Sequence, residues 1–146
     1  MQIQILAVGK IKESYLTTGI NEYLKRLTPY AKIDLQQVKD EKAPEGLSSG
    51  AMHILLEKEA AKLEQLIIPA THLVALDIAG RQFSSPQLAS YLQKLGISGQ
   101  SNITFLIGGS QGLAPRLLQQ ADLRLSFSSL TFPHQLFRLI LLEQLY

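Results

Sequence analysis

Two segments near the end of the chain carry residue types suited to holding a small ligand. An apolar run at 103–107 leads directly into Gly108-Gly109-Ser110-Gln111-Gly112, and a second segment at 125–134 combines apolar residues with Ser and Thr before Pro133-His134. Glycine lets a ligand or another backbone approach closely. In open α/β sheets, ligands bind at the carboxyl ends of the strands. The two segments therefore predict a site that binds a cofactor largely through main-chain groups.

The glycine turn alone leaves several interpretations open. A phosphate-binding P-loop requires a lysine after its last glycine, whereas Leu113 follows Gly112 here, which argues against a nucleoside-triphosphate site. A dinucleotide fingerprint belongs in the first strand-to-helix turn, and this glycine run follows the fourth predicted strand. An ordinary Rossmann methyltransferase fits poorly for the same reason. A tight turn without a ligand remains the alternative, which the second hydroxyl-rich loop makes less favoured.

These loops are positioned by alternating predicted strands and helices. Hydrophobic periodicity predicts strands at 3–8, 33–38, 73–76, 103–107 and 123–127, and helices at 14–28, 51–68, 85–95, 113–121 and from Pro133 onward. We expect the third strand to end at Asp77, Ser85-Pro86 to begin a helix, and the polar segment 40–50 to be a mobile loop. This order predicts an α/β fold with a mainly parallel sheet flanked by helices, and 33–38 as an edge or half-covered strand.

The last predicted helix is apolar around most of its circumference. The residues responsible are Leu136, Phe137, Leu139, Ile140, Leu141, Leu142 and Leu145. A helix of this kind must be buried from several sides. Coverage by a second subunit predicts a homodimer, and central packing within one chain is the alternative.

Composition limits the remaining function classes. The 146 residues suit one domain, and a net charge of +2 is compatible with nucleic acid without requiring it. The absence of cysteine excludes disulfides, thiolate zinc sites and a thiol nucleophile, and fits a reducing cytosol. Three scattered histidines predict no metal site. No apolar run is long enough to span a membrane, and the start of the chain lacks signal-peptide features, so we expect a cytoplasmic protein.

Four motifs together make a more specific resemblance. They are Leu76-Asp77-x-x-Gly80, Leu106-Ile107-Gly108-Gly109-x-x-Gly112-Leu113, Leu125-Ser126-x-Ser128-x-Leu130-Thr131-Phe132-Pro133-His134 and Glu143-Gln144-Leu145-Tyr146. Their order and spacing resemble the RlmH family, the SPOUT-class methyltransferases that act on pseudouridine in large-subunit ribosomal RNA. The likeness runs from Ile3 to the last residue. It implies one SPOUT methyltransferase domain over 1–146, a C-terminal trefoil knot and a homodimer that binds S-adenosylmethionine.

The resemblance also implies the reaction and the cofactor-binding residues. The expected reaction is methylation of N3 of a pseudouridine in 23S ribosomal RNA, probed most naturally on an assembled ribosome. Family members usually continue beyond Glu-Gln-Leu-Tyr into a tail containing His and Tyr, and without it we expect cofactor binding to survive while RNA methylation fails. The cofactor pocket is expected to be lined by Leu76, Gly108, Gly109, Phe127, Ser128, Ser129, Leu130, Thr131 and Phe132.

Candidates for proton transfer and RNA contact follow from position. His134 comes directly after the cofactor loop and is a candidate base, with capping or packing as the alternative. Arg138 lies one turn later and is expected to face phosphate or a flipped base, or else to pair with Glu143. Lys10, Lys12 and Arg81 are candidate phosphate contacts at the carboxyl edge of the sheet, with a solvated charged face as the alternative. Two other functions stay open: a non-catalytic RNA- or ribosome-binding module, and a nucleotide-sensing domain.

Overall fold

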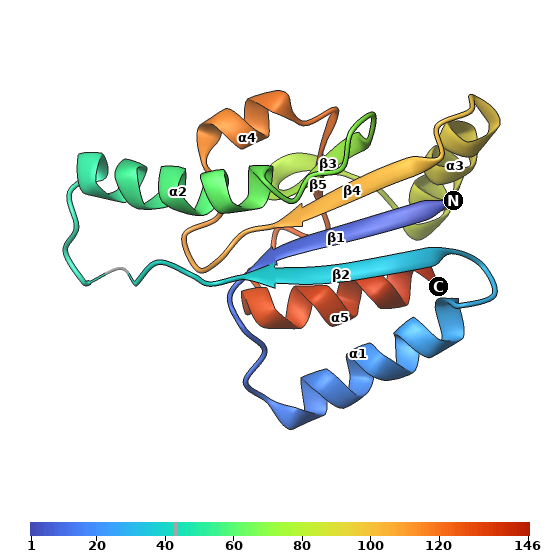
Figure 1. Cartoon of the computed structure of the whole chain (residues 1–146), viewed down its shortest axis with the longest axis horizontal. Helices are drawn as coiled ribbons and strands as arrows, with labels where there is room; N and C mark the ends of the chain where they lie inside the picture. The colour runs from blue at the N-terminus through green and yellow to red at the C-terminus, as the bar shows by residue number, and fades with distance from the viewer. Residues whose placement is uncertain (43) are drawn as a thin grey trace.

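The fold is a single parallel sheet with helices on both faces (Figure 1). The computed structural model describes residues 1–42 and 44–146. Within them, strands and helices alternate as β1 (Gln2–Val8), α1 (Ser14–Leu27), β2 (Lys32–Val38), α2 (Ser49–Glu64), β3 (His72–Gln82), α3 (Ser85–Ile97), β4 (Asn102–Ile107), α4 (Pro115–Gln120), β5 (Leu123–Ser126) and α5 (His134–Leu145). The strand order is β2-β1-β4-β3-β5, and every pairing is parallel. The predicted α/β class is confirmed, with 32–38 as an edge strand.

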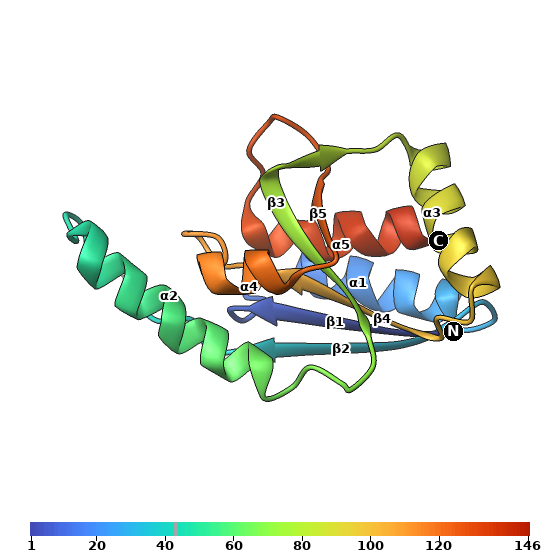
Figure 2. The ribbon, with the colours of Figure 1, turned by 90° about the horizontal axis from the view of Figure 1, so that it is seen from above.

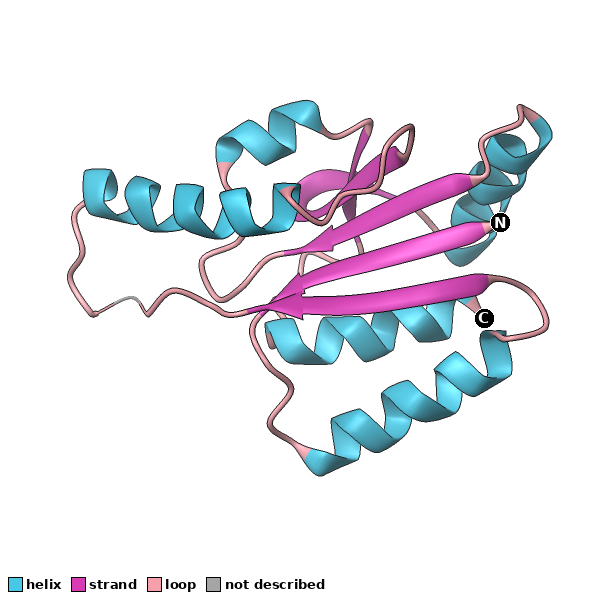
Figure 3. Cartoon of the chain, viewed as in Figure 1, coloured by secondary structure: helices cyan, strands magenta, loops and turns pink. Residues whose placement is uncertain are grey.

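The two faces of the sheet bury separate apolar layers (Figures 2 and 3). Ile3, Ile5 and Ala7 of β1 point to the layer covered by α1, α3 and α5, whereas Leu6 and Val8 point to the layer covered by α2 and α4. This alternation follows from the two-residue period of a strand. Residues 103–107 of β4 are buried throughout, as a central strand between two helical layers must be.

A buried polar pair interrupts the second layer. Gln4 and Thr104 are 1% and 0% exposed. The Gln4 amide donates to the Leu66 carbonyl at 2.7 Å, and its oxygen accepts from the Ile68 N–H at 3.2 Å and from the Thr104 hydroxyl at 3.0 Å. These bonds satisfy buried polar groups and fix the connection between α2 and β3 to the middle of the sheet.

The third strand is longer than predicted, and the prediction that it ends at Asp77 is wrong. It pairs with β5 as far as Leu76, then pairs again from Arg81, with residues 77–80 forming a bulge between the two registers. A Cβ on Gly80 would lie 2.6 Å from the Arg124 carbonyl oxygen, so this close approach requires glycine. Asp and Gly resemble a turn in sequence, and here the bulge accommodates them within the strand.

Several element boundaries also differ from the predictions. Helix α2 ends at Glu64 rather than 68, α3 continues past Gly96 to Ile97, and α4 is shorter than 113–121. The cap of α3 is Ser84, whose hydroxyl accepts from the Gln87 N–H in a capping box, and Ser85 is already helical. The predicted loop at 40–50 includes position 43, which lies outside the described residues, and α2 already begins within it at Ser49.

The last helix is only partly covered within one chain. Arg138, Leu141 and Leu142 are buried, while the other apolar residues of α5 are half-buried. Helix α1 packs against α5, where a Cβ on Gly19 would lie 3.0 Å from the Leu139 side chain. Among the described residues, no helix has both the length and the apolar character needed to cross a membrane.

We predict that Gln4→Leu lowers the free energy of unfolding by about 3 kcal/mol, because the buried carbonyl of Leu66 and N–H of Ile68 lose their partner. Urea unfolding at one fixed protein concentration measures the change. Gln2→Leu, on the same strand, is the matched control and should change stability by about 0.5 kcal/mol or less. Equal effects of the two substitutions would contradict the role given to Gln4.

Candidate cofactor site

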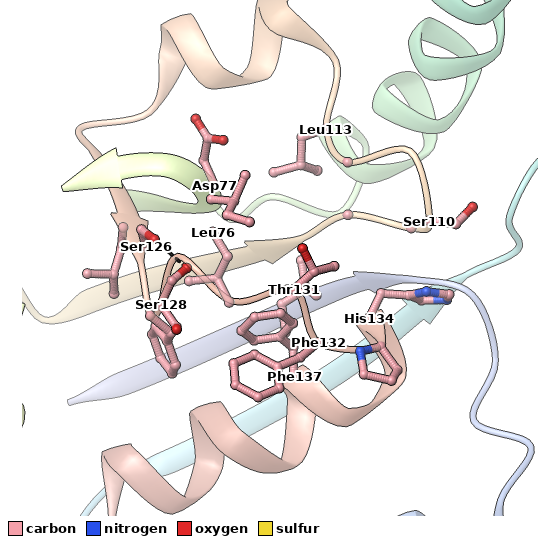
Figure 4. A pocket seen from close by; sticks show the side chains of 18 of the residues that line it. Leu76, Asp77, Ser110, Leu113, Ser126, Ser128, Thr131, Phe132, His134 and Phe137 are labelled. Atoms are coloured by element: carbon pink, nitrogen blue, oxygen red, sulfur yellow. Dashed lines mark hydrogen bonds between the residues drawn. The ribbon is translucent and has the colours of Figure 1, made fainter. Parts of the chain in front are cut away.

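A cavity of about 770 Å³ lies at the carboxyl ends of β3, β4 and β5 (Figure 4). Its walls come from the β3 bulge, from the glycine turn after β4, from the loop after β5, and from the first turn of α5. Figure 4 shows Asp77 and Leu113 on one side of it, with Phe132, His134 and Phe137 on the other. The parallel sheet thus brings together segments more than fifty residues apart in the sequence, because the carboxyl ends of its strands share one edge.

The cavity gathers most of the predicted cofactor residues. Those that line it are Leu76, Gly108, Gly109, Phe127, Ser128, Leu130, Thr131 and Phe132, and His134 lines it as well. Ser129 does not, and it is exposed. The Ser128 hydroxyl accepts from the Leu130 N–H at 2.9 Å, which closes a local turn with Ser129 on its outer side.

The glycine turn is shaped by its own backbone. A Cβ on Gly108 would lie 2.5 Å from the backbone carbon and oxygen of Gly112, so no other residue fits without moving the loop. Gly109 and Gly112 form an antiparallel bridge, in which the Gly112 N–H donates to the Gly109 carbonyl at 3.0 Å. Gly112 itself has φ +80°, a conformation that favours glycine. The turn is therefore closed before any ligand enters.

Aromatic side chains fix the wall on the opposite side. Phe127 and Phe132 both pack edge-on against Phe137 of α5, with ring centroids 6.0 and 5.6 Å apart. Such edge-to-face pairs are favourable beyond the area that they bury. The two rings thus pack in the core and line the cavity at once, which joins the loop after β5 to the helix that follows it.

Sequence reasoning missed several lining residues. They are Asp77, Ile78, Ile107, Ser110, Gln111, Gly112, Leu113, Leu118, Leu125, Ser126, Pro133 and Phe137. Most are neighbours of residues already chosen, so extending each motif to its whole loop would have found them. Asp77 was visible beside Leu76 but was assigned only to the end of a strand. Phe137 lies one helical turn after Pro133, and its role depends on how α5 packs, for which the sequence gives no signal.

His134 stands at the start of α5, close to the end of β1. A Cβ on Gly9 would lie 3.5 Å from His134 Nε2 and 3.8 Å from Arg138 Nη2. Burial lowers the pKa of His134, and the positive charge of Arg138 lowers it further. The neutral imidazole is therefore favoured, and that form can accept a proton.

Arg138 occupies a different environment from the one expected. It is 1% exposed, so it does not present its charge at the surface to phosphate or a flipped base. Its guanidinium donates to the carbonyls of Val8 at 3.0 Å and Gly9 at 2.5 Å, and to the Gln37 side chain at 2.9 Å. The alternative ion pair with Glu143 is not formed in the described part of the chain. Burial lowers the pKa of Arg138 to about 10, which leaves it charged at neutral pH.

The three predicted RNA contacts do not lie together. Lys10 and Lys12 are exposed in the loop after β1, and the Lys12 N–H lies 3.5 Å from the Gln135 side-chain oxygen, beside His134. Arg81 instead lies over the ring of Phe83 at 5.1 Å and does not line the cavity. Within residues 1–42 and 44–146, no three His, Cys, Asp or Glu side chains are grouped so that they could hold a metal ion.

Comparison with known proteins places this arrangement in context. The family described as "Predicted SPOUT methyltransferase" matches residues 1–146. Proteins named ribosomal RNA large subunit methyltransferase H are similar along the whole chain. Those of Desulforamulus reducens and Alkaliphilus oremlandii are 53% and 52% identical over 146 residues, which cover 91% and 92% of their lengths. That of Enterococcus faecalis is 49% identical, with 92% of its length covered.

We predict that Gly108→Leu abolishes binding of S-adenosylmethionine while the protein stays folded, because the new side chain must displace the turn at Gly112. Isothermal titration calorimetry measures the binding, and circular dichroism reports the fold. Gly50→Ala, at an open position in α2, is the control and should leave the affinity unchanged. Unchanged affinity in the Gly108 variant would contradict this assignment of the site.

Proposed function

The chain belongs to the SPOUT methyltransferase family, and from that premise we propose that it transfers the methyl group of S-adenosylmethionine to N3 of a pseudouridine in 23S ribosomal RNA. The observation that carries this proposal is the cavity built jointly by the glycine turn after β4 and the loop after β5. Relatives named as large-subunit ribosomal RNA methyltransferases support the substrate class, since their similarity extends over the whole chain.

The residues around the cavity fit this cofactor. Its volume of about 770 Å³ lies within the usual range of small-molecule sites. Apolar walls such as Leu76, Ile107 and Phe132 suit an adenine ring, while the backbone of 108–112 and 127–132 offers hydrogen-bonding groups. We propose that these two loops belong to a trefoil knot. Its support is family membership, together with a chain that leaves β5 at one sheet edge and returns to α5 beside α1 (Figure 2).

Alignment is the main contribution of the protein in this mechanism. When bound, S-adenosylmethionine supplies a methyl group already activated by a positively charged sulfur. The closed glycine turn and the Phe127–Phe132–Phe137 wall form a rigid cavity, so they hold the donor in one orientation. Correct placement of two reacting groups can lower a barrier by about 7–11 kcal/mol. No covalent intermediate with the protein is needed.

The acceptor nitrogen requires removal of a proton. N3 of pseudouridine carries a hydrogen, and its lone pair can attack the methyl carbon only as that proton leaves. We assign His134 as the group that accepts it, directly or through water, since its imidazole lines the cavity and is kept neutral by burial and by Arg138. Arg138 acts as a positioning residue, because it anchors the first turns of α5 to the end of β1.

The remaining parts of the proposal concern partners. Exposed Lys10 and Lys12 lie near the start of α5 and are proposed to contact RNA phosphates, with Arg81 as a more distant contact. The half-buried apolar side of α5 supports a homodimer, and the residues described here favour recognition of a folded ribosomal surface over a base sequence. A ribosomal RNA substrate places the reaction in the cytoplasm.

The direct test is methyl transfer from radiolabelled S-adenosylmethionine to unmethylated ribosomal particles, with free 23S RNA in parallel. We expect label in large-subunit RNA, and mass spectrometry of its nucleosides should identify N3-methylpseudouridine. Binding of S-adenosylmethionine without transfer would instead indicate a non-catalytic ribosome-binding module. Binding of ATP in its place would indicate nucleotide sensing, and either result would overturn the proposed reaction.

We predict that the transfer rate stays at its plateau down to pH 6.5 and falls only at lower pH. The sign follows from the lowered pKa of His134: its neutral, proton-accepting form persists below the usual value of 6.5. Single-turnover rates across pH 5–8 measure this profile. His134→Gln should slow transfer and remove that limb while leaving cofactor affinity within about twofold. An unchanged profile in the variant would exclude His134 as the proton acceptor.

We predict that Ile140→Asp disrupts the dimer, because it places a charge on the half-buried side of α5. Sedimentation velocity should show monomers, or the protein should become insoluble. Glu143→Lys, at an exposed position of the same helix, is the charge-changing control and should leave the assembly intact. A soluble Ile140 variant that sediments as a dimer would contradict the proposed interface.

A further inference from the structure

We propose that the carboxylate of Asp77 recognises the positive charge of the bound cofactor, and that it makes the cavity prefer the methylated sulfonium form over the neutral thioether product. This inference rests on the proposed function and deepens it. It assigns a specificity-determining role to a residue in the strand bulge, outside the two loops that define the rest of the site.

Asp77 is electrostatically distinct within the cavity. Among the lining residues that the structure describes, it is the only one with an acidic side chain, and none is lysine or arginine. Its surroundings include the apolar residues Leu76, Ile78 and Leu113. Charges interact more strongly beside apolar walls than in bulk water, because the local dielectric constant is lower. A cation bound in this cavity is therefore stabilised chiefly by Asp77.

The local geometry leaves part of the carboxylate available. Asp77 is half-buried, and its Oδ1 accepts from the Ala79 N–H at 3.2 Å, which stabilises the bulge. Its second oxygen has no hydrogen-bond partner within residues 1–42 and 44–146, and Asp77 forms no ion pair there. The bulge is itself strongly constrained, since Gly80 sits against the backbone of Arg124. An unpaired carboxylate held at a cavity wall by a constrained backbone is suited to a cationic ligand.

The positions of Asp77 and His134 give this charge a catalytic context. They come from opposite sides of the cavity (Figure 4), on β3 and on α5. Asp77 can therefore act on the donor without pairing with the proposed proton acceptor. When the methyl group leaves, the sulfur becomes neutral, and the attraction to Asp77 is lost. The product then binds less tightly than the donor, because only the donor retains the differential interaction.

The test compares three ligands against a variant that keeps the turn. In Asp77→Asn, the amide oxygen can still accept from the Ala79 N–H while the charge is removed. Calorimetry with S-adenosylmethionine, S-adenosylhomocysteine and sinefungin then separates charge from shape, because sinefungin carries an amine in place of the sulfonium. We expect affinity for the two cationic ligands to fall about tenfold, and affinity for S-adenosylhomocysteine to change by about twofold or less.

A second variant and a control keep the result interpretable. Asp77→Ser retains a hydroxyl that can accept from Ala79 and should reproduce the same ligand ratio even if Asp77→Asn folds poorly. Asp122→Asn removes a carboxylate that bonds to the Leu73 N–H outside the cavity, and it should leave the ratio unchanged. Equal losses for all three ligands, or no loss, would overturn the role of Asp77. Failure of the unmodified protein to bind S-adenosylmethionine would instead overturn the proposed function.

Discussion

The buried guanidinium of Arg138 is the interaction on which the arrangement of the site depends. Its donors reach the carbonyls of Val8 and Gly9 and the side chain of Gln37, so one side chain joins α5 to the ends of β1 and β2. Its Nε is buried without a partner in the described structure, which adds to the cost of this placement. Hydrogen bonds to a charged donor offset part of that cost, and they fix where the chain returns after the loop that follows β5.

Much of the fold was predictable because its signals are local. Apolar runs such as 103–107 predicted buried strands, and their alternation with amphipathic helices predicted a parallel sheet, which the structure confirms. The rule that parallel strands present their carboxyl ends at one edge then predicted that the glycine turn and the hydroxyl-rich loop would meet. Gly108, Gly109 and Thr131 indeed line one cavity. Here local patterns and topology lead to the same site.

The features that sequence reasoning missed all depend on tertiary packing. Arg138 lies in a helix that is apolar on most sides, so periodicity assigns it no face, and its carbonyl partners are about 130 residues away. The β3 bulge reads as a turn because Asp77 and Gly80 are turn residues, and pairing with β5 resumes only at Arg81. Ser129 belongs to the right loop, but the hydroxyl of its neighbour Ser128 closes a turn that leaves it exposed. In each case a distant or backbone contact decides the outcome.

The most direct measurement is hydrogen–deuterium exchange of the protein with and without S-adenosylmethionine. The account holds that two separate loops, at 108–112 and 127–132, form one binding surface. Added cofactor should therefore slow amide exchange in both segments together, with smaller changes along α2 and β2 on the far side of the sheet. Protection confined to one of these loops, or centred elsewhere in the chain, would contradict the shared site.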